Sequence, residues 1–299
     1  LALFIVFKTF LSEVMGIASG NAPPVPACFA KGTPILLKDG NTKSIELIKV
    51  GDVLLDDAVV TGIMKMSSTN QDIYKLNNIL VTGRHRVFHP EMGLIQSQAH
   101  PSAIKINDFR EEYVYCINTS SKRIVIEGEV FVDWDDLDPM DMYELDRQCN
   151  YLGLLTSELT CKDVHSYLES GILPGSTIEL DDGRSLPIED IDVNDVLRFG
   201  ETVIGIVKVD GKDINKIKEY SIDSNRILRS TQNIRISDPD LGSIISYKMD
   251  GTDIDDKSEY LYHLVTNTGG FIKLAKGIYV GLQRLFGQSA LIDDKCPII

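Results

Sequence analysis

Short apolar runs separated by turns occupy residues 28–132. The runs have the length of strands, and none continues into a sustained helical spacing: TPILL, KSIELI, VGDVLL, DIYKL, ILVTG, RHRVF, YVYCI and RIVIEGEVFV. Asp39 and Gly40 lie between two of these runs. An Asp-Gly pair favours a β-hairpin, because glycine accepts the positive φ that the turn needs. The pattern therefore predicts an all-β unit over residues 28–134.

Part of this pattern occurs twice in the chain. The segment GTPILLKDGNTKSIELIKVGDVLL (32–55) aligns without a gap on GSTIELDDGRSLPIEDIDVNDVLR (175–198), and 12 of 24 positions are identical. Two weaker matches follow, VTGRHRVFHP (81–90) with STQNIRISDP (230–239) and YVYCINT (113–119) with YLYHLVT (260–266). Self-similarity of this kind indicates a duplicated structural unit. We expect a second copy of the β-rich module over residues 171–299.

The residues between the two copies have a different character. Residues 133–147, DWDDLDPMDMYELDR, carry seven acidic side chains and one arginine. Such a run is typical of a solvated linker, and a docking surface for a basic partner is the alternative interpretation. Leucines recur at helical spacing over 151–171, which predicts one or two short helices. We expect an acidic and helical connector over residues 135–170.

The first 27 residues are predicted to form an apolar helix followed by a proline-rich linker. Residues 1–11, LALFIVFKTFL, are apolar except for Lys8, but a helix that crosses a bilayer needs about 20 such residues. Three interpretations stay open: the end of a transmembrane helix that begins before Leu1, the core of a secretory signal, or an apolar helix buried against a partner. A membrane contact would involve residues 1–18. The run GNAPPVP (20–26) cannot hold a helix because of its prolines.

Composition narrows the class of protein. With 299 residues, 43% hydrophobic and 25% charged, the chain can bury a core, which excludes wholesale disorder. A formal net charge of −14 is opposite in sign to a surface that binds phosphates, so nucleic acid is not an expected partner. Five cysteines without a CxxC pair indicate neither a disulfide framework nor a zinc site, and favour a reducing compartment. No cofactor or metal is expected.

Four features of the first copy follow one another in a characteristic order. Cys28 opens a strand, GTPILLKDG and SIELIKVGDV follow, and TGRH places Thr82 and His85 in a T-x-x-H box. Together they resemble the Hint module shared by inteins and the self-processing half of hedgehog proteins. The resemblance covers residues 28–134, and residues 171–283 for the second copy. It implies two tandem, all-β, Hint-like modules.

The resemblance also implies a chemistry for these residues. In the family, the thiolate of the first cysteine attacks the carbonyl of the preceding residue, here Ala27, and forms a thioester. His85 would donate a proton to the amide nitrogen of Cys28, and Thr82 would hydrogen-bond and distort the scissile amide. Imidazole suits this role because its ordinary pKa is about 6.5. Replacing His85 by alanine is then expected to abolish cleavage and leave folding nearly untouched. Taken alone, a cysteine at a strand start is simply a buried small hydrophobe.

Two departures from the family limit this chemistry. A splicing intein ends its module with His-Asn followed by Cys, Ser or Thr, whereas the matching stretch GEVFVDWDD has Asp133 and Trp134 there. Splicing is therefore not expected. The second copy has Gly171 or its neighbours in place of Cys28, and Ile234 in place of His85. We expect this copy to be chemically inactive and to serve packing or binding.

The duplicated β module and the Hint resemblance are compatible with two functions. The first is a structural or scaffold protein built from degenerate Hint-like domains. By analogy with Hint-containing chains of large DNA viruses, it would be a membrane-associated minor capsid component that contacts other structural proteins of the virion. The second is an autoprocessing protein that cleaves its own Ala27–Cys28 bond by an N-to-S acyl shift.

Overall fold

The computed structural model describes residues 27–134 and 170–281. The second range is interrupted at 213, 215–216, 224–225, 232–233, 239–241, 246–250, 269–270 and 276–277. The predicted N-terminal apolar helix and the predicted helices of the connector lie outside the described residues. So does the acidic run after Trp134.

The described residues form strands joined by turns, which confirms the prediction of a mostly β fold. The helical pieces among them are three 3-10 turns: η2 (Ile45–Leu47), η3 (Ser97–Ala99) and η4 (Ile188–Asp190). The first unit contains β1 (Phe29–Ala30), β2 (Pro34–Leu36), β3 (Thr42–Ser44), β4 (Val60–Ser67), β5 (Ile73–Leu76), β6 (Ile79–Thr82), β7 (Arg86–His89), β8 (Gly93–Gln96), β9 (Ile104–Ile106), β10 (Tyr113–Thr119), β11 (Arg123–Ile126) and β12 (Glu129–Val132). The second unit contains β13 (Thr177–Glu179), β14 (Ser185–Pro187), β15 (Val203–Asp210), β16 (Ile217–Asp223), β17 (Arg226–Thr231), β18 (Arg235–Asp238), β19 (Gly242–Ile245), β20 (Thr252–Ile254), β21 (Tyr260–Thr266), β22 (Phe271–Ala275) and β23 (Ile278–Gly281).

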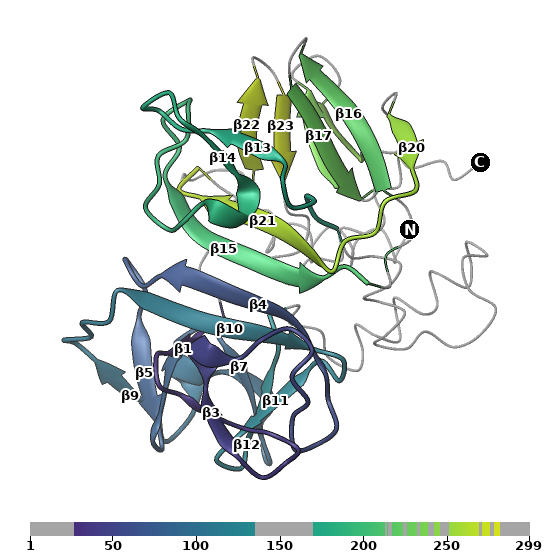
Figure 1. The fold of residues 1–299 in the computed structure, drawn as a ribbon. Helices are drawn as coiled ribbons and strands as arrows, with labels where there is room; N and C mark the ends of the chain where they lie inside the picture. The colour runs from purple at the N-terminus through teal and green to yellow at the C-terminus, as the bar shows by residue number, and fades with distance from the viewer. Residues whose placement is uncertain are drawn as a thin grey trace, which may run out of the picture.

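One sheet of eight strands joins the two units. Its order is β21, β15, β4, β10, β1, β6, β5 and β9. The junction is the antiparallel pair of β4 from the first unit and β15 from the second, which run side by side where the two units meet (Figure 1). Smaller sheets, among them β11-β12-β7-β8 in the first unit and β19-β18-β23-β22 in the second, complete each unit. The site described below lies at β1 and β6, in the first unit's part of the large sheet.

The junction pairs β4 with its counterpart in the second copy, β15. Met64 lies opposite Val207, Gly62 opposite Val209, and Met66 opposite Gly205. Residues 64 and 207 differ by 143 in number, as do the aligned residues 32 and 175. The two strands are therefore related by a local two-fold axis through the Met64–Val207 pair. This is the arrangement of an isologous dimer interface, here within one chain.

Apolar side chains from both units form one core across this junction. Met64 and Met66 of β4 pack in the same buried cluster as Val207 and Val209 of β15. Gly205 allows the close approach, because a β-carbon there would overlap the sulfur of Met66. The units therefore share a core and not merely a sheet edge.

Two details of the sequence-based strand assignment are corrected by the structure. KSIELI is not one strand, since it divides into β3 and the 3-10 turn η2. RIVIEGEVFV is a hairpin of β11 and β12, and its turn residues Glu127 and Gly128 have φ values of 49° and 86°. Strand β4 was not predicted. Its first three residues are all buried and burial alternates from Gly62 onward, but a glycine at a buried position and Ile63 at a partly exposed one hide this alternation in the sequence.

The same contact closes the same turn in each unit. The Gly32 N–H donates to Oε2 of Glu46 at 2.8 Å. The Gly175 N–H donates to Oε2 of Glu189, also at 2.8 Å. The glutamate of the repeated I-E pair thus holds the turn that precedes β2 in the first unit and β13 in the second.

Candidate functional site

Thr82 holds the backbone of Cys28 from both sides. Cys28 immediately precedes β1, whose Phe29 pairs with Val81 of β6. The Cys28 N–H donates to the Thr82 Oγ1 at 2.9 Å, and the Thr82 N–H donates to the Cys28 carbonyl oxygen at 2.9 Å. Both residues are fully buried. The nitrogen of the Ala27–Cys28 bond is therefore fixed on the Thr82 hydroxyl.

The T-x-x-H spacing brings His85 back to the same place. The His85 N–H donates to the Thr82 carbonyl at 3.0 Å, which closes a turn of four residues after β6. The imidazole is fully buried and packs on Phe29, with ring centroids 4.4 Å apart, and on Phe131, at 5.3 Å. The expectation that His85→Ala would leave folding nearly untouched is therefore wrong, because the change would leave a cavity between two phenylalanines.

The hydrogen bond of His85 defines which nitrogen carries the proton. Nε2 lies 2.8 Å from the carbonyl oxygen of Val132. A carbonyl oxygen only accepts, so Nε2 is the donor and Nδ1 of the neutral ring has a free lone pair. Nδ1 makes no hydrogen bond to any of the described residues. The imidazole thus presents a buried proton acceptor.

Burial keeps this imidazole neutral. Desolvation lowers the pKa of His85 to about 4, against the weaker raising effects of the Val132 and Cys28 backbones. The raising effect of the Cys28 backbone comes from an acceptor, its carbonyl group, so the ring lies near the peptide that follows Cys28. With this lowered pKa, His85 must first take up a proton before it can donate one to the Cys28 nitrogen.

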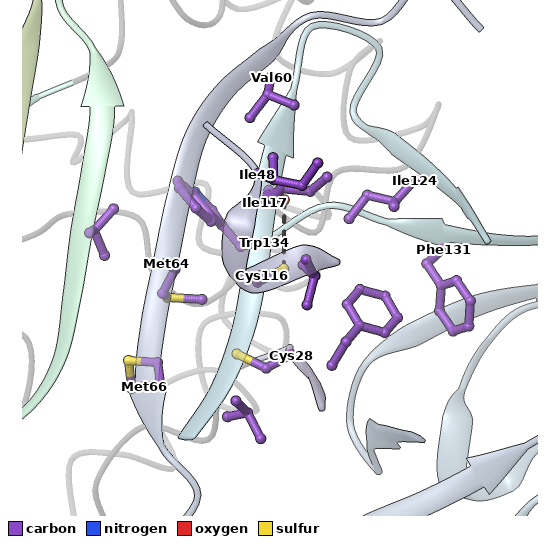
Figure 2. Packing of buried hydrophobic residues seen from close by; sticks show 14 of the residues in the cluster. Cys28, Ile48, Val60, Met64, Met66, Cys116, Ile117, Ile124, Phe131 and Trp134 are labelled. Carbon is purple, nitrogen blue, oxygen red and sulfur yellow. Dashed lines mark hydrogen bonds between the residues drawn. The ribbon is translucent and has the colours of Figure 1, made fainter. Parts of the chain in front are cut away.

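The thiol of Cys28 points away from the imidazole. Its sulfur is directed toward Met64 and Met66 and away from Phe131 (Figure 2). Successive side chains of a strand point to opposite faces, and His85 packs on the side chain of Phe29. Burial raises the pKa of the Cys28 thiol well above its ordinary value. In this state the nucleophile is protonated and packed in the core.

We expect Cys28 to react slowly with alkylating reagents in the folded protein. Because the thiol is buried and protonated, carbamidomethylation at pH 8 should be at least about 100-fold slower than in urea. Cys116, which is also a buried thiol, should behave in the same way. Quenched labelling with peptide mass analysis measures both rates. A native rate for Cys28 close to the rate in urea would show that the thiol is exposed.

The neutral state of His85 predicts a pH dependence of stability. Its folded pKa of about 4 lies below its unfolded value of about 6.5. The unfolded chain therefore binds more protons between these values, so stability is complete above about pH 6.5 and falls toward pH 4, by up to about 3 kcal/mol. Urea unfolding at several pH values should show a flatter profile for His85→Gln. The partly exposed His89→Gln variant is the control and should keep the wild-type profile.

The second unit repeats the backbone arrangement without the reactive groups. The Gly171 N–H donates to the Thr231 Oγ1 at 3.0 Å, and the Thr231 N–H donates to the Gly171 carbonyl at 2.9 Å. Ile234 is fully buried in the place of His85. A β-carbon on Gly171 would lie 2.6 Å from Cβ of Leu261, so this position has no room for a thiol.

A histidine that the sequence left unassigned lies beside this second position. His263 of β21 is buried, and its Nε2 is hydrogen-bonded to the carbonyl oxygen of Ser170. His263 aligns with Cys116 in the YVYCINT and YLYHLVT match. The alignment of the two copies therefore pointed to His263 as the counterpart of Cys116. Its contact with Ser170 could not be predicted, because the two residues are 93 positions apart in the chain.

Two further expectations concern metals and membranes. Within the two described ranges, no three His, Cys, Asp or Glu side chains gather as metal ligands would. Across the same residues, no helix has both the length and the apolar character needed to cross a bilayer.

No protein-family model matches the chain. A stretch of 100 residues, 33% of this chain, is 30% identical to part of a catalytic polypeptide of the V-type proton ATPase from Candida tropicalis. The match spans 9% of that ATPase polypeptide, so it concerns a small part of the relative.

Proposed function

We propose that the first unit is a Hint-type self-cleaving centre that acts on the bond between Ala27 and Cys28. The observation that supports this proposal is the hydrogen bond from the scissile Cys28 N–H to Thr82, with the buried His85 ring next to the Cys28 backbone. Thr82 Oγ1 accepts the Cys28 N–H at 2.9 Å, and the Cys28 backbone lies close enough to His85 to affect its pKa. Nδ1 of that ring makes no hydrogen bond among the described residues.

The reaction is an exchange of the acyl group from nitrogen to sulfur. The Cys28 sulfur attacks the Ala27 carbonyl carbon, a C–S bond forms, and the C–N bond to Cys28 breaks. The proton lost by the thiol is taken up by His85 Nδ1 and delivered to the leaving nitrogen, which becomes a free amine. Hydrolysis, or attack by a small nucleophile on the thioester, then releases the segment before Cys28. An imidazole that starts as an acceptor and then donates matches the tautomer set by Val132.

The proposed site is inactive in its resting state. The thiol is buried, its pKa is raised, and its sulfur faces the core residues of β4. Cys28 must rotate its side chain toward Ala27 and lose its proton before it can attack. Activity therefore depends on local opening around β1 and on the supply of a nucleophile.

A scaffold role is favoured for the second unit by a separate observation. Gly171 and Thr231 keep the two backbone hydrogen bonds, yet a side chain at 171 would clash with Leu261. Packing alone explains why such a unit is retained, because β15 extends the sheet of the first unit through β4. Membership of a virion, association with a membrane and contacts with other assembly proteins stay predictions.

The direct test is thiol-induced cleavage of the full chain. Incubation with dithiothreitol should release the segment that ends at Ala27, followed by intact mass analysis. The Cys28→Ala variant should remain whole, and Cys116→Ala, which changes another buried cysteine, should cleave at the wild-type rate. A wild-type chain that stays intact over days, or a Cys28→Ala chain that is cut, would exclude the self-cleaving function.

A further inference from the structure

Three buried polar side chains meet beside the turn that joins β10 to β11. Asn118, Lys122 and Asp133 are each at most 2% exposed. Nζ of Lys122 donates to Oδ1 of Asn118 at 3.1 Å and lies 3.7 Å from Oδ2 of Asp133. The amine of Lys122 thus lies within contact distance of both a carboxamide and a carboxylate, and neither the self-cleaving centre nor the repeat accounts for this arrangement.

The backbone is arranged to direct the lysine inward. Lys122 has a φ of 58°, a left-handed conformation that is unfavourable for a residue with a side chain. Its N–H donates to the Thr119 carbonyl at 3.2 Å, and its own carbonyl accepts the Asp133 N–H at 3.3 Å. The Thr119 N–H donates to Oδ2 of Asp133 at 3.0 Å. These contacts fix the amine and the carboxylate relative to each other.

The surroundings disfavour a separated pair of charges. Ile117, Ile124, Phe131 and Trp134 belong to the buried apolar cluster of this unit (Figure 2). Removing two ions from water is costly, and the attraction between them repays that cost only when their geometry is excellent. Transfer of a proton from the Lys122 ammonium to the Asp133 carboxylate removes both charges. It leaves a neutral amine, which is a nucleophile, next to the side-chain amide of Asn118.

We propose that Lys122 and Asn118 form an intramolecular isopeptide bond, with Asp133 as the proton carrier. The Lys122 nitrogen attacks Cγ of Asn118, a C–N bond forms, and the original carboxamide C–N bond breaks. Asp133 takes a proton from the amine and passes it to the leaving nitrogen, which departs as ammonia. Amine plus carboxamide give a secondary amide plus ammonia, so no oxidant, reductant or cofactor is needed.

The bond would fix the part of the fold that supports His85. It would tie the end of β10 to Lys122, whose carbonyl holds the Asp133 N–H. Asp133 directly follows Val132, whose carbonyl accepts the His85 hydrogen bond. A covalent link here would make the position of the imidazole independent of a buried ion pair.

The mass of the folded, full-length chain tests the proposal. The chain should weigh about 17 Da less than its sequence mass, because one ammonia is lost. Trypsin should fail to cut after Lys122, and the peptide containing residues 118–122 should give no backbone fragments that separate Asn118 from Lys122. Lys122→Arg and Asp133→Asn should both restore the sequence mass of that peptide. If either variant fails to fold, the wild-type peptide map alone still decides the question.

Three results would overturn the proposal. One is a folded wild-type chain at its full sequence mass. Another is a peptide lighter by about 17 Da that trypsin still cuts after Lys122 and that hydroxylamine cleaves, since this describes a succinimide at Asn118 and not a cross-link. The third is a loss of about 18 Da with Lys122 joined to Asp133, which would assign a different electrophile.

Discussion

Replacing Thr82 by valine should slow thiol-induced cleavage at the Ala27–Cys28 bond by about 100-fold or more. Valine has nearly the shape of threonine but lacks the oxygen that accepts the Cys28 N–H at 2.9 Å. The scissile nitrogen is then no longer held against the site, and its buried N–H has lost its partner. The rate of release of the upstream segment in dithiothreitol, followed by intact mass, measures the effect.

The second unit supplies a matched control for this change. Thr231→Val removes the equivalent acceptor, which Gly171 uses at 3.0 Å. Each substitution should lower the free energy of unfolding by about 1–3 kcal/mol, because each leaves a buried donor unsatisfied. Only Thr82→Val should slow cleavage. The Thr82→Ser variant keeps the hydroxyl and should cleave at most of the wild-type rate. Equal slowing by Thr82→Val and Thr231→Val would mean that general destabilisation, and not the Thr82 hydroxyl, controls the reaction.

Replacing Gly62 by alanine should lower the free energy of unfolding by about 2 kcal/mol or more. A β-carbon at this position would lie 2.6 Å from Cζ2 of Trp134, a rigid ring atom that cannot move away without a shift of the indole. Urea unfolding measures the loss. Trp134 is the single tryptophan of the chain, so its fluorescence should also report the displacement directly.

The corresponding glycine of the second copy provides the comparison. Gly205 faces the sulfur of Met66, which belongs to a flexible side chain that can change rotamer. Gly205→Ala should therefore cost less than Gly62→Ala, although both glycines lie in the strands of the same junction. Combining Gly62→Ala with Trp134→Leu should cost less than the sum of the two single changes. Simple additivity would show that the glycine and the indole are not coupled.

The sequence predicted the strands whose residue types alternate clearly and failed where the residue types do not follow the alternation of burial. Strand β6 and strand β10 follow from their alternating and β-branched residues. Strand β4 was missed because Gly62 occupies a buried position and the apolar Ile63 a partly exposed one, so the residue types do not follow the alternating burial. The pairing of β4 with β15 could not be predicted, since either strand could equally have remained an edge.

The sequence named candidate site residues, but it did not predict the direction of their side chains or their protonation. The order of Cys28, Thr82 and His85 in the sequence named residues that lie near one another in the structure, with Thr82 on the Cys28 N–H and His85 near the Cys28 carbonyl. The direction of the thiol, the tautomer of His85 and its low pKa depend on Val132 and on the core behind β1. The burial of Lys122 beside Asp133 could not be predicted from the sequence either, because a lysine in a polar turn is normally solvated.

The central claim is that only the first unit can cleave its own chain. Hydroxylamine tests it most directly, because it would trap an acyl intermediate in either unit. The full chain is incubated with hydroxylamine at neutral pH, and the released segments are identified by mass. We expect a segment that ends in the hydroxamate of Ala27, which is absent from Cys28→Ala, and no segment that ends at Ser170. A chain that yields no hydroxamate at Ala27, or one that is cut equally before Gly171, would contradict it.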